Sequence, residues 1–296
     1  MNDLPDHPAE VQTPWGRTGG AASISSPDRR HSVNRMQTIL RPQRAPDPLN
    51  KVPIAALGFW VVKIMSTTVG ETGADYLAVN AGFGKSATSA AMAAFLVMAL
   101  FVQMRSKTYT PWTYWLTVVL VSVVGTQITD LLTDGLGVSL HLSTAVFAML
   151  LAAIFAAWYR TEGTLSILAI DTRRRELFYW TAILCTFALG TAAGDLATEA
   201  WGLGFQLGVV VFAVLIGLIV LARALGANAV FAFWIAYILT RPLGAALGDL
   251  LSQAKTYGGL GLGPMLTSVI FLSIIVVLVG ISQRGASQST GAKSPQ

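Results

Sequence analysis

The chain has 296 residues, of which 53% are hydrophobic and 12% charged, with a formal net charge of +5. This composition, with a mean hydropathy of +0.59, lies outside the usual range of soluble globular domains and indicates an integral membrane protein. The basic residues do not form a stripe on one predicted surface, which argues against nucleic-acid binding. The single cysteine, Cys185, excludes an intramolecular disulfide framework and a thiolate metal cluster. We expect no cofactor.

The first 50 residues differ from the rest of the chain. They are rich in Pro, Ser, Gly, Asp and Arg, and they contain no apolar run long enough for a signal peptide. From there to about residue 283, apolar stretches recur without a soluble block large enough to hold its own core. We therefore predict a disordered basic cytoplasmic tail at 1–50, one transmembrane domain at 51–283 and a disordered cytoplasmic tail at 284–296.

Eight apolar segments follow one another within this domain, each close to the ~20 residues that a helix needs to cross a bilayer. Backbone groups in lipid must be satisfied within their own segment, so we predict that all eight are helices. The segments are 53–78, 86–104, 111–133, 140–159, 177–200, 206–223, 228–253 and 264–282. The predicted fold class is an all-α integral membrane protein.

Basic residues alternate between the two sides of the predicted helices. Both tails and the connections after the second, fourth and sixth segments carry nearly all of them, including the run Arg173–Arg175, whereas the opposite connections hold only Lys85 and Lys255. The positive-inside rule then predicts that both termini of this multi-pass protein are cytoplasmic.

An internal repeat runs through the apolar region. In each copy a glycine follows a tryptophan by ten residues, and an aspartate follows the glycine by five. Four ungapped matches at three positions are very improbable by chance and predict repeats at about 52–107, 108–172, 173–226 and 227–283. The copies are Trp60, Gly70 and Asp75; Trp115, Gly125 and Asp130; Trp180, Gly190 and Asp195; and Trp234, Gly244 and Asp249.

With these four tryptophans, the chain resembles a family of bacterial membrane-anchored proteins of unknown function. That family is built from four tandem repeats, each with two transmembrane segments and a characteristic tryptophan. The resemblance covers about 52–283 and implies the architecture and a location in the bacterial inner membrane, but no activity. We interpret the repeated tryptophans as packing and anchoring residues, and the repeated glycines as sites of close helix packing or as hinges.

Each repeat crosses the membrane twice, so the four copies enter it with the same polarity. This predicts parallel repeats related by an axis along the membrane normal, in a pseudo-symmetric bundle. Within one copy, the tryptophan and the aspartate lie about 60° apart around the helix and about 22 Å apart along it. They mark the two ends of a similar face.

Acidic residues outnumber basic ones in or near the predicted membrane region, where only Lys63 and Arg241 oppose them. Charges inside a membrane are costly and commonly mark ion or proton pathways. Three pairs are spaced four apart and repel each other unless a cation, a shared proton or water intervenes. The acids are Glu71, Asp75, Asp130, Asp134, Asp195, Glu199 and Asp249.

Neutral polar residues one turn deeper can support these acids. They are Thr72, Thr126, Gln127 and Thr191. An all-oxygen site of this kind favours hard cations such as Mn²⁺, Mg²⁺ or Ca²⁺, or H⁺. The fourth copy carries Arg241 and Pro242; we expect the proline to kink or break its helix, and the arginine to pair with an acid of another copy as an internal counter-ion.

These features predict a transporter that moves a divalent cation or a proton-coupled solute through an acidic site shared by the four repeats. Its expected partners are the lipid bilayer and that cation or solute, and the oligomeric state stays open. One alternative is a membrane scaffold or sensor with a dry, occluded centre. The acids would then be solvated at the outer surface, about 27–33 Å from the inner boundary, or would join helices as polar contacts. An enzyme is not expected, because no recognisable nucleophile is present.

Overall fold

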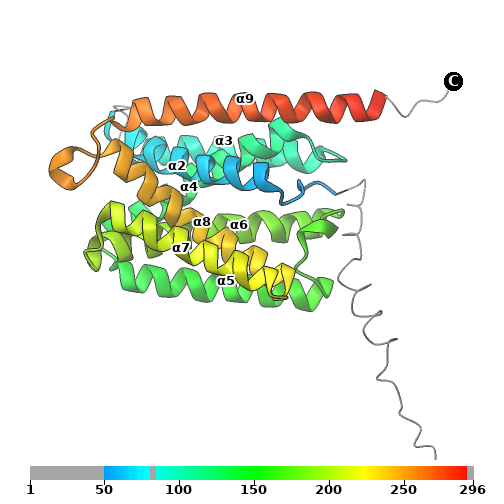
Figure 1. Ribbon diagram of the computed structural model, residues 1–296, viewed down its shortest axis with the longest axis horizontal. Coiled ribbons are helices and arrows are strands. Elements are labelled where there is room, and N and C mark those ends of the chain that lie inside the picture. The colour runs from blue at the N-terminus through cyan, green and yellow to red at the C-terminus, as the bar shows by residue number, and fades with distance from the viewer. Residues whose placement is uncertain (1–49, 81–84, 292–296) are drawn as a thin grey trace, which may run out of the picture. The chain divides into compact units, whose positions relative to one another are not determined.

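Eight long α-helices make up most of the part of the chain described by the computed structural model, which is residues 50–80 and 85–291 (Figure 1). No strand occurs in those ranges. The helices are α2 (Leu57–Asn80), α3 (Lys85–Arg105), α4 (Pro111–Asp130), α5 (Leu140–Glu162), α6 (Arg173–Asp195), α7 (Gly204–Ala224), α8 (Ala229–Ser252) and α9 (Pro264–Gly291). All belong to a unit that spans Pro46–Gln296. The predicted tail at 1–50 lies, except for its last residue, outside the described residues.

Seven of these helices are long and apolar enough to cross a membrane, which indicates a multi-pass membrane protein. The exception is α2, which carries Lys63, Glu71 and Asp75 along its length. Within the most apolar 18-residue window, more than half of the residues are buried in α4, α6 and α8, against at most 17% in α3, α5, α7 and α9. The first helix of each repeat is therefore an inner helix, and the second is an outer helix with an apolar exposed surface.

The inner helices form a closed ring. Helix α2 packs on α4, α4 on α6, α6 on α8, and α8 returns to α2. Each outer helix packs mainly on the inner helix of the next repeat: α3 on α4, α5 on α6, α7 on α8 and α9 on α2. Figure 1 shows the helices running along a common direction. The four repeats are thus related by a pseudo-fourfold axis through the inner ring.

A close backbone approach at each repeated glycine joins neighbouring inner helices. Each glycine faces the residue seven places after the tryptophan of the next copy, and a methyl group there would lie within 2.6 Å of that side chain. Small residues allow this spacing between membrane helices. The four contacts are Gly70 with Ser122, Gly125 with Phe187, Gly190 with Arg241 and Gly244 with Thr67.

The repeated tryptophans form a second ring, ten residues before the glycine contacts along each inner helix. Each stacks beside the aromatic residue that precedes the tryptophan of the previous copy, with ring centroids 5.5–6.3 Å apart. The pairs are Phe59 with Trp115, Tyr114 with Trp180, Tyr179 with Trp234 and Phe233 with Trp60. We call these eight side chains the aromatic belt. The hydroxyls of Tyr114 and Tyr179 share a hydrogen bond of 2.6 Å inside it.

The chain segment before α2 covers the same end of the bundle. Lys51 is buried and its Nζ lies 2.7 Å from Glu176 Oε2, while its backbone N–H donates to the carbonyl of Ile170. The connection between α5 and α6 is held there as well, because Trp234 Nε1 donates to the Leu165 carbonyl over 2.9 Å. These two segments therefore cover the aromatic belt at the end of the bundle where the inner helices begin.

The expected helix boundaries hold to within a few residues, with three differences. Pro242 does not break α8, which runs unbroken from Ala229 to Ser252; its ring packs beside Gly190 and Gly194, so neighbouring helices support the backbone. Helix α6 begins four residues early, because the Thr172 hydroxyl caps it by accepting from the N–H of Arg175.

Helix α9 accounts for the third difference. It extends to Gly291, into the predicted tail at 284–296, and no proline interrupts it between Pro264 and that end.

The glycine contacts give a direct test of the ring. In Gly125→Ala the new methyl group meets the Phe187 Cβ at 2.6 Å, an atom fixed to the backbone. We expect a loss of about 1–3 kcal/mol in stability. Gly217→Ala is the matched control: it lies in α7 with nothing within 4 Å, and alanine favours a helix. Thermal unfolding of the purified protein, followed by tryptophan fluorescence, compares the two; equal midpoints would contradict the packing.

Candidate functional site: an acidic cup

A cavity of about 580 Å³ opens at the end of the inner ring opposite the aromatic belt. Every inner helix contributes to its wall, and all seven acids predicted from the sequence line it. They are Glu71, Asp75, Asp130, Asp134, Asp195, Glu199 and Asp249. None of the described lining residues is basic. We call this cavity the acidic cup.

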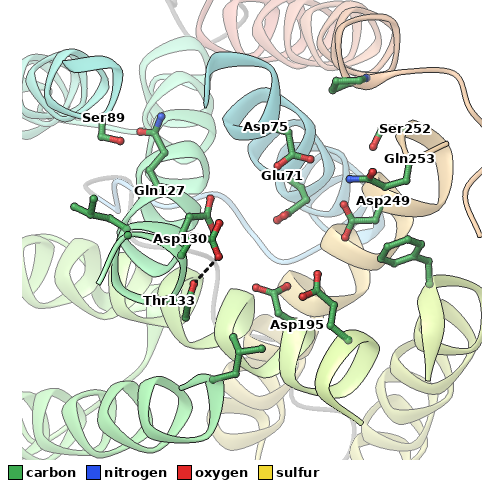
Figure 2. Close-up of a pocket in the computed structure, with 17 residues that line it drawn as sticks. Glu71, Asp75, Ser89, Gln127, Asp130, Thr133, Asp195, Asp249, Ser252 and Gln253 are labelled. Atoms are coloured by element: carbon green, nitrogen blue, oxygen red, sulfur yellow. Dashed lines mark hydrogen bonds between the residues drawn. The ribbon is translucent and has the colours of Figure 1, made fainter. Parts of the chain in front are cut away.

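The acids differ in depth. Asp134 and Glu199 are exposed at the rim, whereas Asp249 and Glu71 are buried, at 8% and 6% exposed. Figure 2 shows Glu71, Asp75, Asp130, Asp195 and Asp249 arranged around one open space. The cup therefore admits solvent at its rim and narrows to a buried floor at Glu71.

Local helix geometry produces the rim. Asp130 and Asp195 are the last residues of α4 and α6, and each is followed by a π-helical turn, η1 (Leu131–Gly135) or η3 (Leu196–Ala200). In η3 the N–H of Trp201 donates to the carbonyl of Leu196, five residues back. Such turns occur often at functional sites. They carry Asp134 and Glu199, so two repeats supply the exposed acids.

Arg241 lies beneath Glu71, the floor of the acidic cup. It is fully buried and pairs with Glu71, with 2.7 Å between Nη2 and Oε2, which is the pairing expected with an acid of another copy. The same nitrogen contacts the hydroxyls of Thr126 and Thr191, and Nη1 donates to the Thr67 carbonyl over 2.9 Å.

Three of the side chains that contact the Arg241 guanidinium hold the same position in their repeats. Glu71, Thr126 and Thr191 each lie eleven residues after the tryptophan of their copy. One guanidinium from the fourth copy is thus bound by the same position of the other three. Arg241 consequently lies on the pseudo-fourfold axis, between the acidic cup and the aromatic belt.

The predicted supporting residues divide between different places. Gln127 lines the cup, and its Oε1 has no hydrogen-bond partner within 50–80 and 85–291. Thr126 and Thr191 contact Arg241 instead. Thr72 faces away from the cup, since its hydroxyl bonds with Ser268 of α9 at 2.7 Å. It holds the position that Gln127 holds in the second copy, twelve residues after the tryptophan, so the two equivalent side chains have different surroundings.

Sequence reasoning missed other lining residues. Gln253 lies nineteen residues after its tryptophan, the position that holds Asp134 and Glu199 in other copies, so aligning the repeats would have found it. Ser89 comes from an outer helix, where no pattern distinguishes it.

The carboxylates do not form a compact metal site. Among the described residues, no three His, Cys, Asp or Glu side chains converge closely enough to hold one metal ion. The acids instead surround a space many times the volume of a bare ion. A divalent ion in the cup would keep water between itself and most of the carboxylates, as Mg²⁺ often does.

Together, the fold and the cup define an all-helical membrane protein of four tandem two-helix repeats. The family described as Repeat of Unknown Function (DUF347) matches the chain at 58–109, 113–164, 178–226 and 232–284. The chain belongs to this family, and the four matches confirm the repeats predicted from the sequence. No curated protein and no solved structure matches it.

The buried ion pair gives the second prediction. Glu71→Gln and Arg241→Gln each leave one charge buried without its partner, which we expect to cost about 3–5 kcal/mol. The double variant removes both charges and should cost less than the sum of the two. Thermal unfolding of the purified variants measures the cycle. Lys107→Gln, at an exposed position outside the cup, is the control and should change stability by no more than about 0.5 kcal/mol. Strict additivity would refute the coupling.

Proposed function

We propose that the protein is a transporter of the bacterial inner membrane that moves a cation, or a proton-coupled solute, along the axis of its four repeats. One observation carries the proposal: seven acids from all four repeats gather in one solvent-reaching cup whose described lining includes no basic side chain. Intramembrane acids that face a cavity are a recurrent feature of ion and proton pathways.

The axis beneath the cup also favours transport over a scaffold. A scaffold needs only a well-packed centre, and apolar residues would provide it at least as stably as buried charges. Here the centre contains Arg241 and Lys63, both fully buried, together with Glu71. Buried charges on the axis, in contact with an acidic entrance, have a use in a protein that must bind and release a charged substrate.

A binding sequence follows from these contacts. A cation that enters the cup meets the rim acids first, then the half-buried aspartates, and competes with Arg241 for Glu71 at the floor. Arg241 keeps three other partners, the Thr126 and Thr191 hydroxyls and the Thr67 carbonyl, so it can release Glu71 without losing every hydrogen bond. Passage then requires the aromatic belt to open. The conformation described corresponds to a state open at the cup and closed at the belt.

Charge distribution supports an orientation with the belt toward the cytoplasm. Arg174 and Arg175 lie at the belt end, both bonded to Glu162, whereas the sequence of the opposite connections contains only Lys85 and Lys255 as basic residues. The positive-inside rule places the more basic side in the cytoplasm. The cup then faces away from the cytoplasm.

Transport by reconstituted protein tests the proposal. Replacement of Asp75, Asp130, Asp195 or Asp249 by Asn keeps size but removes one charge from the cup. We expect each variant to lower the flux of Mn²⁺ or methylammonium into proteoliposomes by about tenfold, roughly the loss of one favourable charge contact. Asp171→Asn, outside the cup, should transport at the native rate. Native rates in all four cup variants, or no flux by the native chain, would reject a transporter and favour the scaffold.

Cysteine labelling tests the orientation. Cys185 is buried, and Cys185→Ser provides a background without thiols. In that background, Asp134→Cys at the rim should react with a membrane-impermeant maleimide added to intact spheroplasts. Asp171→Cys, at the belt end, should react only after the membrane is permeabilised. The reverse pattern would invert the proposed topology.

A further inference from the structure

Lys63 is the most unusual side chain on the axis. It is fully buried, and its Nζ has no hydrogen-bond partner in the described part of the chain. Buried lysines are rare unless they are paired. The Nζ atom lies instead 3.9 Å from the ring centroid of Phe187 and 4.2 Å from that of Tyr237. Two aromatic faces therefore surround this nitrogen where an anion would be its usual partner.

No acid in the described part of the chain pairs with Lys63. Glu71, a buried acid on the same helix, is bonded to Arg241, and Arg241 itself lies 5.8 Å from the same Phe187 centroid. The charged groups that face Lys63 are thus Arg241 of α8 and, beyond it, Glu71 of its own helix. The Tyr237 hydroxyl is also buried and has no hydrogen-bond partner among the described residues. This pocket therefore combines aromatic rings with two polar groups, the Lys63 Nζ and the Tyr237 hydroxyl, that have no hydrogen-bond partner among the described residues.

The repeat fixes its position. Lys63 and Tyr237 lie three residues after the tryptophan of their copies, and Phe187 lies seven after its own. The pocket is therefore between Arg241 and the aromatic belt, beneath the floor of the cup. Any substrate that passes along the axis must pass here.

We propose that Phe187 and Tyr237 form an inner cation site that the Lys63 side chain fills in this conformation, and that an organic ammonium or guanidinium group of the substrate occupies it when Lys63 withdraws. The inference rests on the proposed transport function and names its substrate class. Aromatic faces bind organic cations well, whereas Mg²⁺, Mn²⁺ and Ca²⁺ require oxygen ligands that this pocket does not supply. The absence of a compact carboxylate site in the cup points the same way.

Arg241 supports the same substrate class. It shows that the axis can bind a guanidinium through Glu71, two threonine hydroxyls and a carbonyl. Arg241 and Lys63 thus occupy positions suited to a substrate group of their own kind. A transported cation would replace each of the two side chains in turn.

Chemical rescue tests the inference without requiring transport. Lys63→Ala empties the pocket, and n-propylammonium restores most of the missing side chain. We expect n-propylammonium to bind purified Lys63→Ala at least about tenfold more tightly than the native chain, and to raise its unfolding midpoint. Neutral n-propanol should not do so, which separates cation binding from simple filling of a cavity. Equal effects of the amine on both proteins would overturn the proposal.

Ring variants in the Lys63→Ala background locate the binding. Adding Phe187→Leu removes one aromatic face and should abolish the rescue. Adding Tyr237→Phe keeps the ring and should preserve it. Rescue that survives the loss of Phe187 would move the bound amine to the cup and would refute the inner site.

A second measurement applies if Lys63→Ala does not fold. In proteoliposomes of the otherwise native chain, Phe187→Leu should lower methylammonium flux about tenfold, and Phe187→Tyr should retain it. Unchanged flux in Phe187→Leu overturns the inner site while leaving the transporter standing. Rescue by n-propylammonium in a chain that transports nothing would instead retain the site and reject the proposed function.

Discussion

The close approach of each inner helix to the next is the constraint on which the other features depend. It occurs where a glycine meets the residue seven places after the tryptophan of the neighbouring copy, as at Gly125 with Phe187. Because the same contact recurs four times, it sets all inner helices at one height and closes the ring. Each repeated aspartate follows its glycine by five residues, about 7.5 Å along the helix. The glycine contacts therefore bring four aspartates from distant parts of the chain to the mouth of one cavity.

The backbone follows a fourfold pattern, but the chemistry on the axis does not. The position seven after the tryptophan holds Thr67, Ser122, Phe187 and Arg241, and the position eleven after it holds Glu71, Thr126, Thr191 and Ala245. A symmetric arginine would place four positive charges together on the axis. One arginine instead uses the equivalent position of three other copies, while Ala245, in its own helix, leaves the space open. The packing of the ring requires equivalent contacts in all four copies, whereas the binding of one guanidinium on the axis requires residues that differ between the copies.

Sequence patterns predicted the parts that depend on periodicity. The spacing of Trp, Gly and Asp gave the repeats, hydropathy gave the helices, and the excess of acids indicated a shared site. The rotation of side chains about the helices was harder to infer: Thr72 was grouped with Thr126 although it faces α9. The effect of Pro242 also depended on contacts with Gly190 and Gly194 that no local pattern reveals. Lys63 was noted only as a charge, because its aromatic partners come from α6 and α8, far away in the sequence.

The order of charges along the axis limits how a cation can move through it. On the proposed mechanism the cup attracts a cation, and Arg241 and Lys63 block the axis below it. Glu71 neutralises the charge of Arg241, whereas the Lys63 nitrogen lies against the faces of two rings. A substrate cation can then bind Glu71 only if Arg241 moves, and it can reach the two rings only if Lys63 withdraws. Arg241 and Lys63 would thus prevent leakage when substrate is absent, and they would yield their positions only to a group that replaces their own interactions.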